Sequence, residues 1–382
     1  MNFQAYHESD VRNFQLHLKA PELLEDGFLT PPQYEQVKTA FPVELRQGNI
    51  FVRIGLFLFT GLCILFSILF VSWIIGVLDS GQRGLGGLLL FFAVALTALN
   101  EYLIRKRHWY RQGSDNALCY ASIICLVIGV GLVSKFDDPL DFSVFFLVFS
   151  SLAAVRYGDP IAALGAFYTL LFSFILAYDS NGLPMIHLPF VGVILSLTVY
   201  FFAKTALKNV SWFYWEDCFK VLEIVGLVAF YGSINYFVVD KLLDRDPETS
   251  IPSPYNYIFT FLTMFVPLFY LMAGIQTKDR ILWILGGLGI VASILTFRYY
   301  HAIMPIEWAL TLAGLALLVL AFLLIHYLKT PRKNFAYQPE RGKSSLIETL
   351  IVNQFLPQTA ANKDTIPFGG GDFGGGGASE GY

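Results

Sequence analysis

Few side chains in the long apolar blocks of this sequence could do chemistry, and Glu223 is the strongest of them. A carboxylate among apolar residues is costly, so it is expected to hold a proton, bind a ligand or pair with a base. Lys220 precedes Glu223 by three residues on the same helical face and could neutralise it. The pattern leaves a structural ion pair and a proton or ligand site as alternatives.

Three other polar residues in or beside apolar blocks are candidates for a functional site. Asn235 is the deepest amide, and a lone asparagine can bond a neighbouring helix or a substrate. Glu307 opens the last apolar block, where polar residues anchor a helix at the membrane interface. Glu101 precedes a basic run by four residues and is expected to pair with those bases at the end of a helix.

The basic run beyond Glu101 also contains an aromatic residue. Its members are Arg105, Lys106, Arg107, Trp109 and Arg111. Basic residues next to an apolar block indicate a loop that stays in the cytoplasm. The same side chains could contact anionic lipid headgroups, since each base near an acidic leaflet adds ~1 kcal/mol of attraction.

Motifs that would identify an enzyme or a cofactor site are absent from the sequence. It has no HExxH, P-loop, GxSxG or dinucleotide fingerprint. The four cysteines have no CxxC spacing and no histidine partner that would indicate a metal or a disulfide. We therefore predict no catalytic residue, no metal and no cofactor.

Composition and patterning predict the elements that position these residues. Of the 382 residues, 55% are hydrophobic and 14% are charged, whereas about 25% are charged in a soluble domain. Apolar blocks of about 18 residues or more indicate membrane spans. We predict an all-α, polytopic membrane bundle of about ten spans, near residues 52–78, 84–104, 116–135, 141–155, 160–179, 187–206, 218–239, 256–275, 281–298 and 306–328. The fourth is short, so whether it crosses fully is open.

The distribution of basic residues predicts the orientation of these spans. With a cytoplasmic N-terminus, sixteen Lys and Arg residues near span ends fall inside and five fall outside. Because Lys and Arg accumulate on the cytoplasmic side, this favours ten spans with both termini in the cytoplasm. The net charge of −3 gives no reason to expect nucleic-acid binding.

The chain divides into three parts. We predict that residues 1–49 form a cytosolic helical element and that residues 50–329 form the membrane bundle. Residues 330–382 are predicted to form a cytosolic tail with a short amphipathic helix and a disordered, glycine-rich end. The N-terminal element is too small to bury a core alone. It is expected to pack between its own helices, on the membrane, or against another protein.

Short motifs predict local structure in two places. Thr30 and Gln33 form a capping box around Pro31 at the start of a helix. Gly158 predicts a tight turn between the fourth and fifth spans, which Arg156 and Asp159 could close as an ion pair. Glycines clustered near residues 84–87, 129–131 and 286–289 predict close helix packing.

The N-terminal region carries a family resemblance. The stretch Leu-Leu-Glu-Asp-Gly-Phe-Leu-Thr-Pro-Pro-Gln-Tyr-Glu at residues 23–35 stands ahead of a many-spanning region. It resembles the signature of a bacterial family of polytopic membrane proteins of unknown function, from which it departs in the pair Pro31–Pro32. The glycine-rich end looks like the tails of several bacterial envelope proteins. The resemblance implies a bacterial protein of the cytoplasmic (inner) membrane and supplies no activity.

Three classes of function remain open from the sequence. The first is a non-enzymatic scaffold, sensor or assembly partner, since the spans are poor in charge and residues 1–49 and 364–382 could bind another protein. The second is a transporter of small solutes or ions, although no inverted repeat is evident. The third is an intramembrane enzyme acting on lipid or glycan. The sequence specifies neither the substrate, nor the partner, nor the oligomeric state.

Overall fold

The computed structural model describes residues 3–25, 28–76, 81–243, 253–301 and 305–328. These residues form α-helices and short 3-10 helices, and their one β-bridge joins Arg46 to Trp109. The elements are α1 (Glu8–Glu25), α2 (Pro31–Ala40), α3 (Ile50–Ile74), α4 (Gly81–Arg107), α5 (Ser114–Ser134), α6 (Pro139–Tyr157), α7 (Pro160–Ser180), η2 (Met185–His187), α8 (Leu188–Ala206), η3 (Val210–Trp215), α9 (Glu216–Ile234), α10 (Tyr236–Leu243), α11 (Ser253–Thr277), α12 (Arg280–His301) and α13 (Ile306–Leu328). The predicted tail, 330–382, lies outside the described residues.

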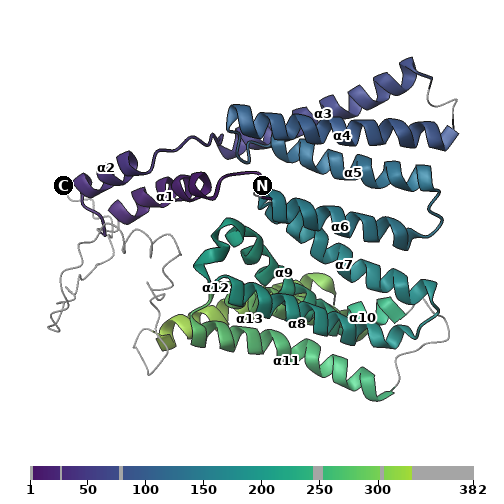
Figure 1. The fold of residues 1–382 in the computed structure, drawn as a ribbon. Helices are drawn as coiled ribbons and strands as arrows, with labels where there is room; N and C mark the ends of the chain where they lie inside the picture. The colour runs from purple at the N-terminus through teal and green to yellow at the C-terminus, as the bar shows by residue number, and fades with distance from the viewer. Residues whose placement is uncertain (1–2, 26–27, 77–80, 244–252, 302–304, 329–382) are drawn as a thin grey trace.

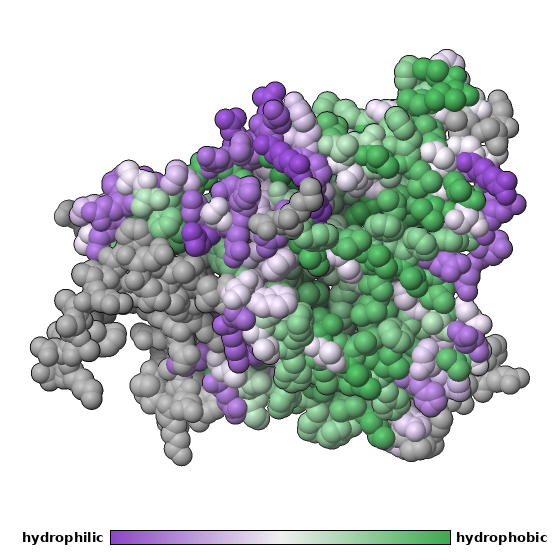
Figure 2. Space-filling model, in the orientation of Figure 1, coloured by the Kyte–Doolittle hydropathy of each residue, from purple (hydrophilic) through white to green (hydrophobic). Residues whose placement is uncertain are grey.

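The helices of the bundle have the length and composition of membrane spans. Within the described residues, eight are long and apolar enough to cross: α3 to α7, η2 with α8, α11 and α12. The bent pair α9–α10 makes a ninth if it counts as one span, and α13 contains a shorter apolar stretch. Figure 2 shows hydrophobic residues over the middle of the bundle and hydrophilic ones gathered toward its two ends. The chain is an all-α, multi-pass membrane protein.

The fourth predicted span is longer in the structure than in the sequence pattern. It corresponds to α6, which has 19 residues and is long enough to cross. Asp138 caps its first turn, where Oδ1 accepts a hydrogen bond from Leu140 N at 2.8 Å. Gly158 ends it in the left-handed conformation, with φ of 60°. Between these caps the helix gains two residues at each end that the predicted span of residues 141–155 leaves out.

The N-terminal helices α1 and α2 pack on one end of the bundle (Figure 1). Val11 and Phe14 of α1 and Val37 of α2 join one buried cluster, which also contains Tyr110 and Tyr214 from the bundle. The capping residue Gln33 accepts hydrogen bonds from N and Oγ1 of Thr30, as the motif predicts. The apolar faces of α1 and α2 are thus covered by each other and by the bundle.

Glycines allow the closest helix contacts, as their clustering predicts. A Cβ atom on Gly86 would lie 3.0 Å from the carbonyl oxygen of Gly129, so α4 and α5 meet at backbone distance. On α12, a Cβ on Gly289 would lie 2.9 Å from Pro267 of α11. This second contact fixes α11 against α12 near the site described next.

Candidate functional site

The bundle contains a broken helix at Asn235. Helix α9 ends at Ile234, α10 begins at Tyr236, and the two axes differ by 66°. Asn235, between the two helices, supplies hydrogen bonds to both helix ends. Its N–H donates to the carbonyl of Tyr231 at 2.9 Å, and its Oδ1 accepts from Phe237 N at 3.0 Å. One asparagine is therefore the C-cap of α9 and the N-cap of α10.

Side chains from α9 and α12 hold this break in place. Asn235 Nδ2 donates to the hydroxyl of Tyr231 at 3.0 Å, and Thr296 of α12 donates to Asn235 Oδ1 at 3.3 Å. The Tyr231 hydroxyl also lies 2.9 Å from Ser293 Oγ. Asn235 is only 4% exposed. Because a buried amide without partners would be costly, this satisfied network stabilises the bend.

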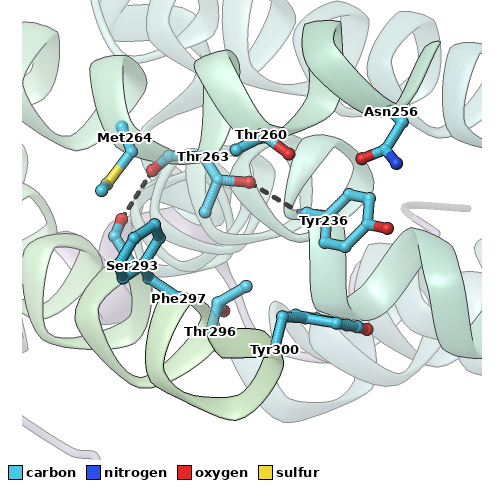
Figure 3. A pocket seen from close by; sticks show the side chains of 9 residues that line it. All are labelled: Tyr236, Asn256, Thr260, Thr263, Met264, Ser293, Thr296, Phe297 and Tyr300. Atoms are coloured by element: carbon cyan, nitrogen blue, oxygen red, sulfur yellow. Dashed lines mark hydrogen bonds between the residues drawn. The ribbon is translucent and has the colours of Figure 1, made fainter. Parts of the chain in front are cut away.

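A pocket of about 280 Å³ lies beside the break, between α10, α11 and α12 (Figure 3). We call it the hydroxyl pocket. Its lining residues bring six hydroxyl groups and one amide together with apolar atoms, and none of them carries a charge: Tyr236, Asn256, Thr260, Thr263, Met264, Ser293, Thr296, Phe297 and Tyr300. Such a lining suits a small, uncharged, polar molecule.

Part of this lining is structural. Thr263 Oγ1 accepts from Tyr236 N at 2.8 Å, which ties the start of α10 to α11. Ser293 Oγ donates to the carbonyl of Thr263 at 2.6 Å, which ties α11 to α12. At the rim, the Tyr300 hydroxyl donates to the carboxylate of Asp240. These bonds shape the pocket and leave its remaining polar groups to face the cavity.

Two of the remaining polar groups lie on the α11 side. Asn256 and Thr260 are four residues apart, so they share one face of the helix. Figure 3 shows them side by side at the pocket, near the ring of Tyr236. Within the part of the chain that the structure describes, neither of these two side chains makes a hydrogen bond. They are the groups best placed to bond a solute.

The other polar region lies at the end of the bundle that carries α1. We call it the charged seam, formed by Glu101, Arg111, Arg156, Asp159 and Asp217. Glu101 Oε1 accepts from Arg156 Nε at 2.7 Å, and Arg156 Nη1 donates to the carbonyl oxygen of Phe3 at 2.8 Å. The backbone oxygen of Arg156 accepts from Ala5 N at 2.9 Å. The seam thus fastens the N-terminal segment to α4 and α6.

The sequence pattern pairs Arg156 with Asp159, and the structure separates them. Asp159 instead accepts from the hydroxyl of Tyr120 at 2.8 Å and caps α7 through Ile161 N at 2.9 Å. Glu101 does contact Arg105, as expected, but at 3.6 Å and with that arginine 72% exposed. The stronger partner of Glu101 comes from a different helix.

Arg111 was a candidate for contact with lipid headgroups, but in the structure its side chain is mostly buried within the protein. Its side chain is only 16% exposed and forms an ion pair with Asp217, while Nη2 donates to the carbonyl of Gly158 at 2.7 Å. Burial disfavours the charged guanidinium, but Tyr110 and Asp217 outweigh burial and hold the pKa of Arg111 above its ordinary value. Arg111 therefore joins the α4–α5 loop to the α6–α7 turn and to α9.

The rest of the basic run keeps the exposure that headgroup binding needs. Arg105, Lys106 and Arg107 form the exposed last turn of α4. Trp109 is half-buried beside Arg46 in the β-bridge. These four residues stay candidates for contact with lipid headgroups.

The remaining sequence candidates lie apart from the hydroxyl pocket. Lys220 Nζ lies 2.8 Å from Glu216 Oε1 and 3.8 Å from Asp217 Oδ1, at the seam end of α9. Glu223 is buried in α9, with 8% of its surface exposed. Glu307 is exposed in the first turn of α13. Of the sequence candidates, only Asn235 takes part in the network beside the pocket.

Comparison with known proteins yields no relative. No family model, no curated protein and no solved structure matches the chain. The resemblance of residues 10–42 to a bacterial membrane family therefore stays a prediction. What the protein does has to be argued from its own geometry.

Sequence reasoning missed most of the hydroxyl pocket. Threonine, serine and tyrosine are common in membrane helices, where they often bond their own backbone, so single hydroxyls carry little signal. A usable signal was the spacing of Asn256, Thr260 and Thr263 on one face of α11, opposite Ser293 and Thr296 on α12. Two polar stripes on neighbouring apolar helices predict a polar interface or a pocket.

Proposed function

We propose that the protein transports a small, uncharged, polar solute across the membrane. The observation that supports this most directly is the hydroxyl pocket beside the broken α9–α10 span. Transporters commonly build their solute sites from discontinuous helices, because a break makes polar groups available at membrane depth. Here Asn235 caps both helix ends, and the pocket offers the free side chains of Asn256 and Thr260.

The absence of charge on the nine lining residues supports the class of solute. An ion or a charged metabolite would have to lose its hydration shell without an opposite charge in the lining, which is costly. Hydroxyl and amide groups instead replace the hydrogen bonds of a polyol or an amide at little cost. The rings of Tyr236, Phe297 and Tyr300 provide the apolar surface that such solutes also present.

A non-enzymatic scaffold, sensor or assembly partner is the second candidate. The N-terminal element supports a role in assembly, since it is firmly held where it could meet a cytosolic protein. However, its apolar faces pack within the chain, which leaves less surface for a partner on residues 1–49. The other proposed partner segment, 364–382, lies outside the described residues. An intramembrane enzyme acting on lipid or glycan ranks third, because the hydroxyl pocket offers no general base.

The proposed setting is the cytoplasmic membrane of a bacterium, with ten spans and both termini in the cytoplasm. The excess of basic residues on one side supports this orientation. It puts the charged seam and α1–α2 at the cytoplasmic end, and the hydroxyl pocket in the outer half of the bundle. The pocket would then receive solute from outside the cell.

Solute flux into vesicles tests the proposal. The purified protein is reconstituted with phosphatidylethanolamine and phosphatidylglycerol, and swelling in gradients of glycerol, urea or xylitol is followed by stopped-flow light scattering. We expect faster swelling with the protein for at least one of these solutes. Thr260→Val should slow it, because it removes a free hydroxyl from the pocket.

Thr198→Val provides the matched control. Thr198 lies on the exposed face of α8, where its hydroxyl donates to the carbonyl of Ile194 at 2.7 Å. This variant should swell as fast as the unmodified protein. If vesicles with and without the protein swelled equally for all three solutes, the transporter proposal would fail, and co-purification of a partner would become the next measurement.

A further inference from the structure

A second cavity, also of about 280 Å³, lies on the other side of α10. We call it the apolar groove. It runs between α7, α8, α9 and α10, where Phe174, Leu188, Leu195, Gly232 and Val239 are among its lining residues. Of the described residues that line it, only Tyr168 and Ser233 have polar side-chain atoms, and Ser233 Oγ donates to the carbonyl of Ala229 at 2.8 Å. The groove therefore suits an apolar occupant.

The mouth of the groove opens toward the bilayer. Tyr168, Val228 and Val238 line it and are 43%, 41% and 45% exposed, on three different helices. The helices α7 and α8 are among those long and apolar enough to cross a membrane, so their exposed apolar side chains face hydrocarbon. The groove is thus continuous with the lipid-facing surface.

The interior of the apolar groove has unfilled space next to Gly232. A Cβ atom built on Gly232 would meet no atom within 4 Å, although Gly232 lines the groove. On α8, lining residues run from Leu188 to Leu195, which is roughly 10 Å along the helix axis, or about a third of the ~30 Å hydrocarbon core. The groove therefore follows the axis of α8 over this length.

We propose that the apolar groove binds the end of an acyl chain of a membrane lipid. Acyl chains are the apolar molecules that surround the mouth, and the groove follows the axis of α8 as a chain lying along this helix would. An empty groove would leave its lining side chains without contacts on one side, and a chain restores those dispersion contacts. The proposal is independent of any transport activity.

An occupied groove would press on the broken helix. α10 contributes Val238, Val239 and Leu242 to the apolar groove, while Tyr236 at its start lines the hydroxyl pocket. The same short helix therefore separates lipid on one side from the polar cavity on the other. The acyl chain would take the space into which α10 could otherwise move.

Photocrosslinking to lipid tests the inference. The full-length protein is placed in vesicles of phosphatidylethanolamine and phosphatidylglycerol that contain a phospholipid with a diazirine near the end of one acyl chain. After illumination, modified residues are located by mass spectrometry. We expect adducts concentrated on the groove residues of α8 and α9, and we expect Gly232→Phe to abolish them by filling the space.

Gly287→Phe is the matched control, because Gly287 of α12 also has no atom within 4 Å of a built Cβ and lies outside the groove. Should Gly232→Phe fail to fold, Val228→Trp closes the mouth from its exposed position instead. Adducts spread evenly over the lipid-facing helices, or adducts on the groove that survive both variants, would overturn the proposal. Co-purification of a different apolar molecule in the groove would overturn the assignment to an acyl chain.

Discussion

The charged seam and the hydroxyl pocket use polar residues in opposite ways. In the seam, Glu101 pairs with Arg156 and Arg111 with Asp217, so the charged side chains join parts of the bundle to one another, and Arg156 also holds the N-terminal segment. In the hydroxyl pocket the side chains are neutral, and Asn256 and Thr260 are left to face a cavity. Charged residues in a membrane protein are functional candidates by default. In this protein the charged side chains stabilise the fold, and the neutral groups are available for binding.

Removing Arg156 should have the largest effect on stability. Arg156→Met leaves the mostly buried Glu101 without its closest base and frees the backbone of Phe3, so we expect a loss of about 3 kcal/mol. The thermal unfolding midpoint in detergent measures this. Arg105→Met is the control, because it removes an exposed base 3.6 Å from the same carboxylate and should cost about 0–1 kcal/mol. Equal losses would mean that the seam is no stronger than a surface pair.

The next largest effect is expected at the break. Asn235→Leu removes the cap of α10 and the partner of Tyr231, which should cost about 2 kcal/mol. Solute flux should fall with it, because the pocket depends on the start of α10. Circular dichroism during heating and vesicle swelling measure the two effects. Normal flux with an unchanged unfolding midpoint would show that the bend needs no cap.

Asn256→Leu should separate function from stability. The Asn256 side chain makes no hydrogen bond within the described residues, so the free energy of unfolding should change by less than about 0.5 kcal/mol. Flux should nevertheless fall, since a free amide of the pocket is lost. A large drop in the unfolding midpoint would instead show that Asn256 stabilises the fold, as the charged residues of the seam do.

Glu223→Gln should have the smallest effect on flux. Glu223 lies twelve residues before Asn235 on α9, roughly 18 Å along the helix, and it is absent from the pocket lining. We expect swelling rates to be unchanged, because the variant leaves the lining of the pocket intact. If the variant folded normally but solute flux were abolished, the solute path would have to include Glu223. A charged residue, and not the neutral hydroxyl pocket, would then be the functional one.

Local signals in the sequence predicted most of the helices. Each apolar block corresponds to a helix or to the α9–α10 pair, because burying backbone in lipid requires helical hydrogen bonds. The capping residues Thr30 and Gln33 also behave as their motif predicts. That ten blocks make ten complete spans stays a prediction.

Contacts between distant residues could not be predicted in the same way. Apart from Gly232 and Ser233, the residues on both sides of Asn235 are mostly apolar, so hydropathy continues through a break that tertiary hydrogen bonds stabilise. Arg156 was expected to bond its near neighbour Asp159, yet Glu101, 55 residues away, provides its ion pair. The partner of a charged side chain depends on which helices become neighbours.

The docking of α1 also has a consequence for biosynthesis. Its apolar face is buried partly by Phe213 and Tyr214, which leave the ribosome long after α1 does. At about 5–20 residues per second, that interval is on the order of 10 s. During it, Val11 and Phe14 are without their final neighbours and need a temporary cover, such as the membrane surface or a chaperone. The last step in assembling the N-terminal end therefore waits for the middle of the chain.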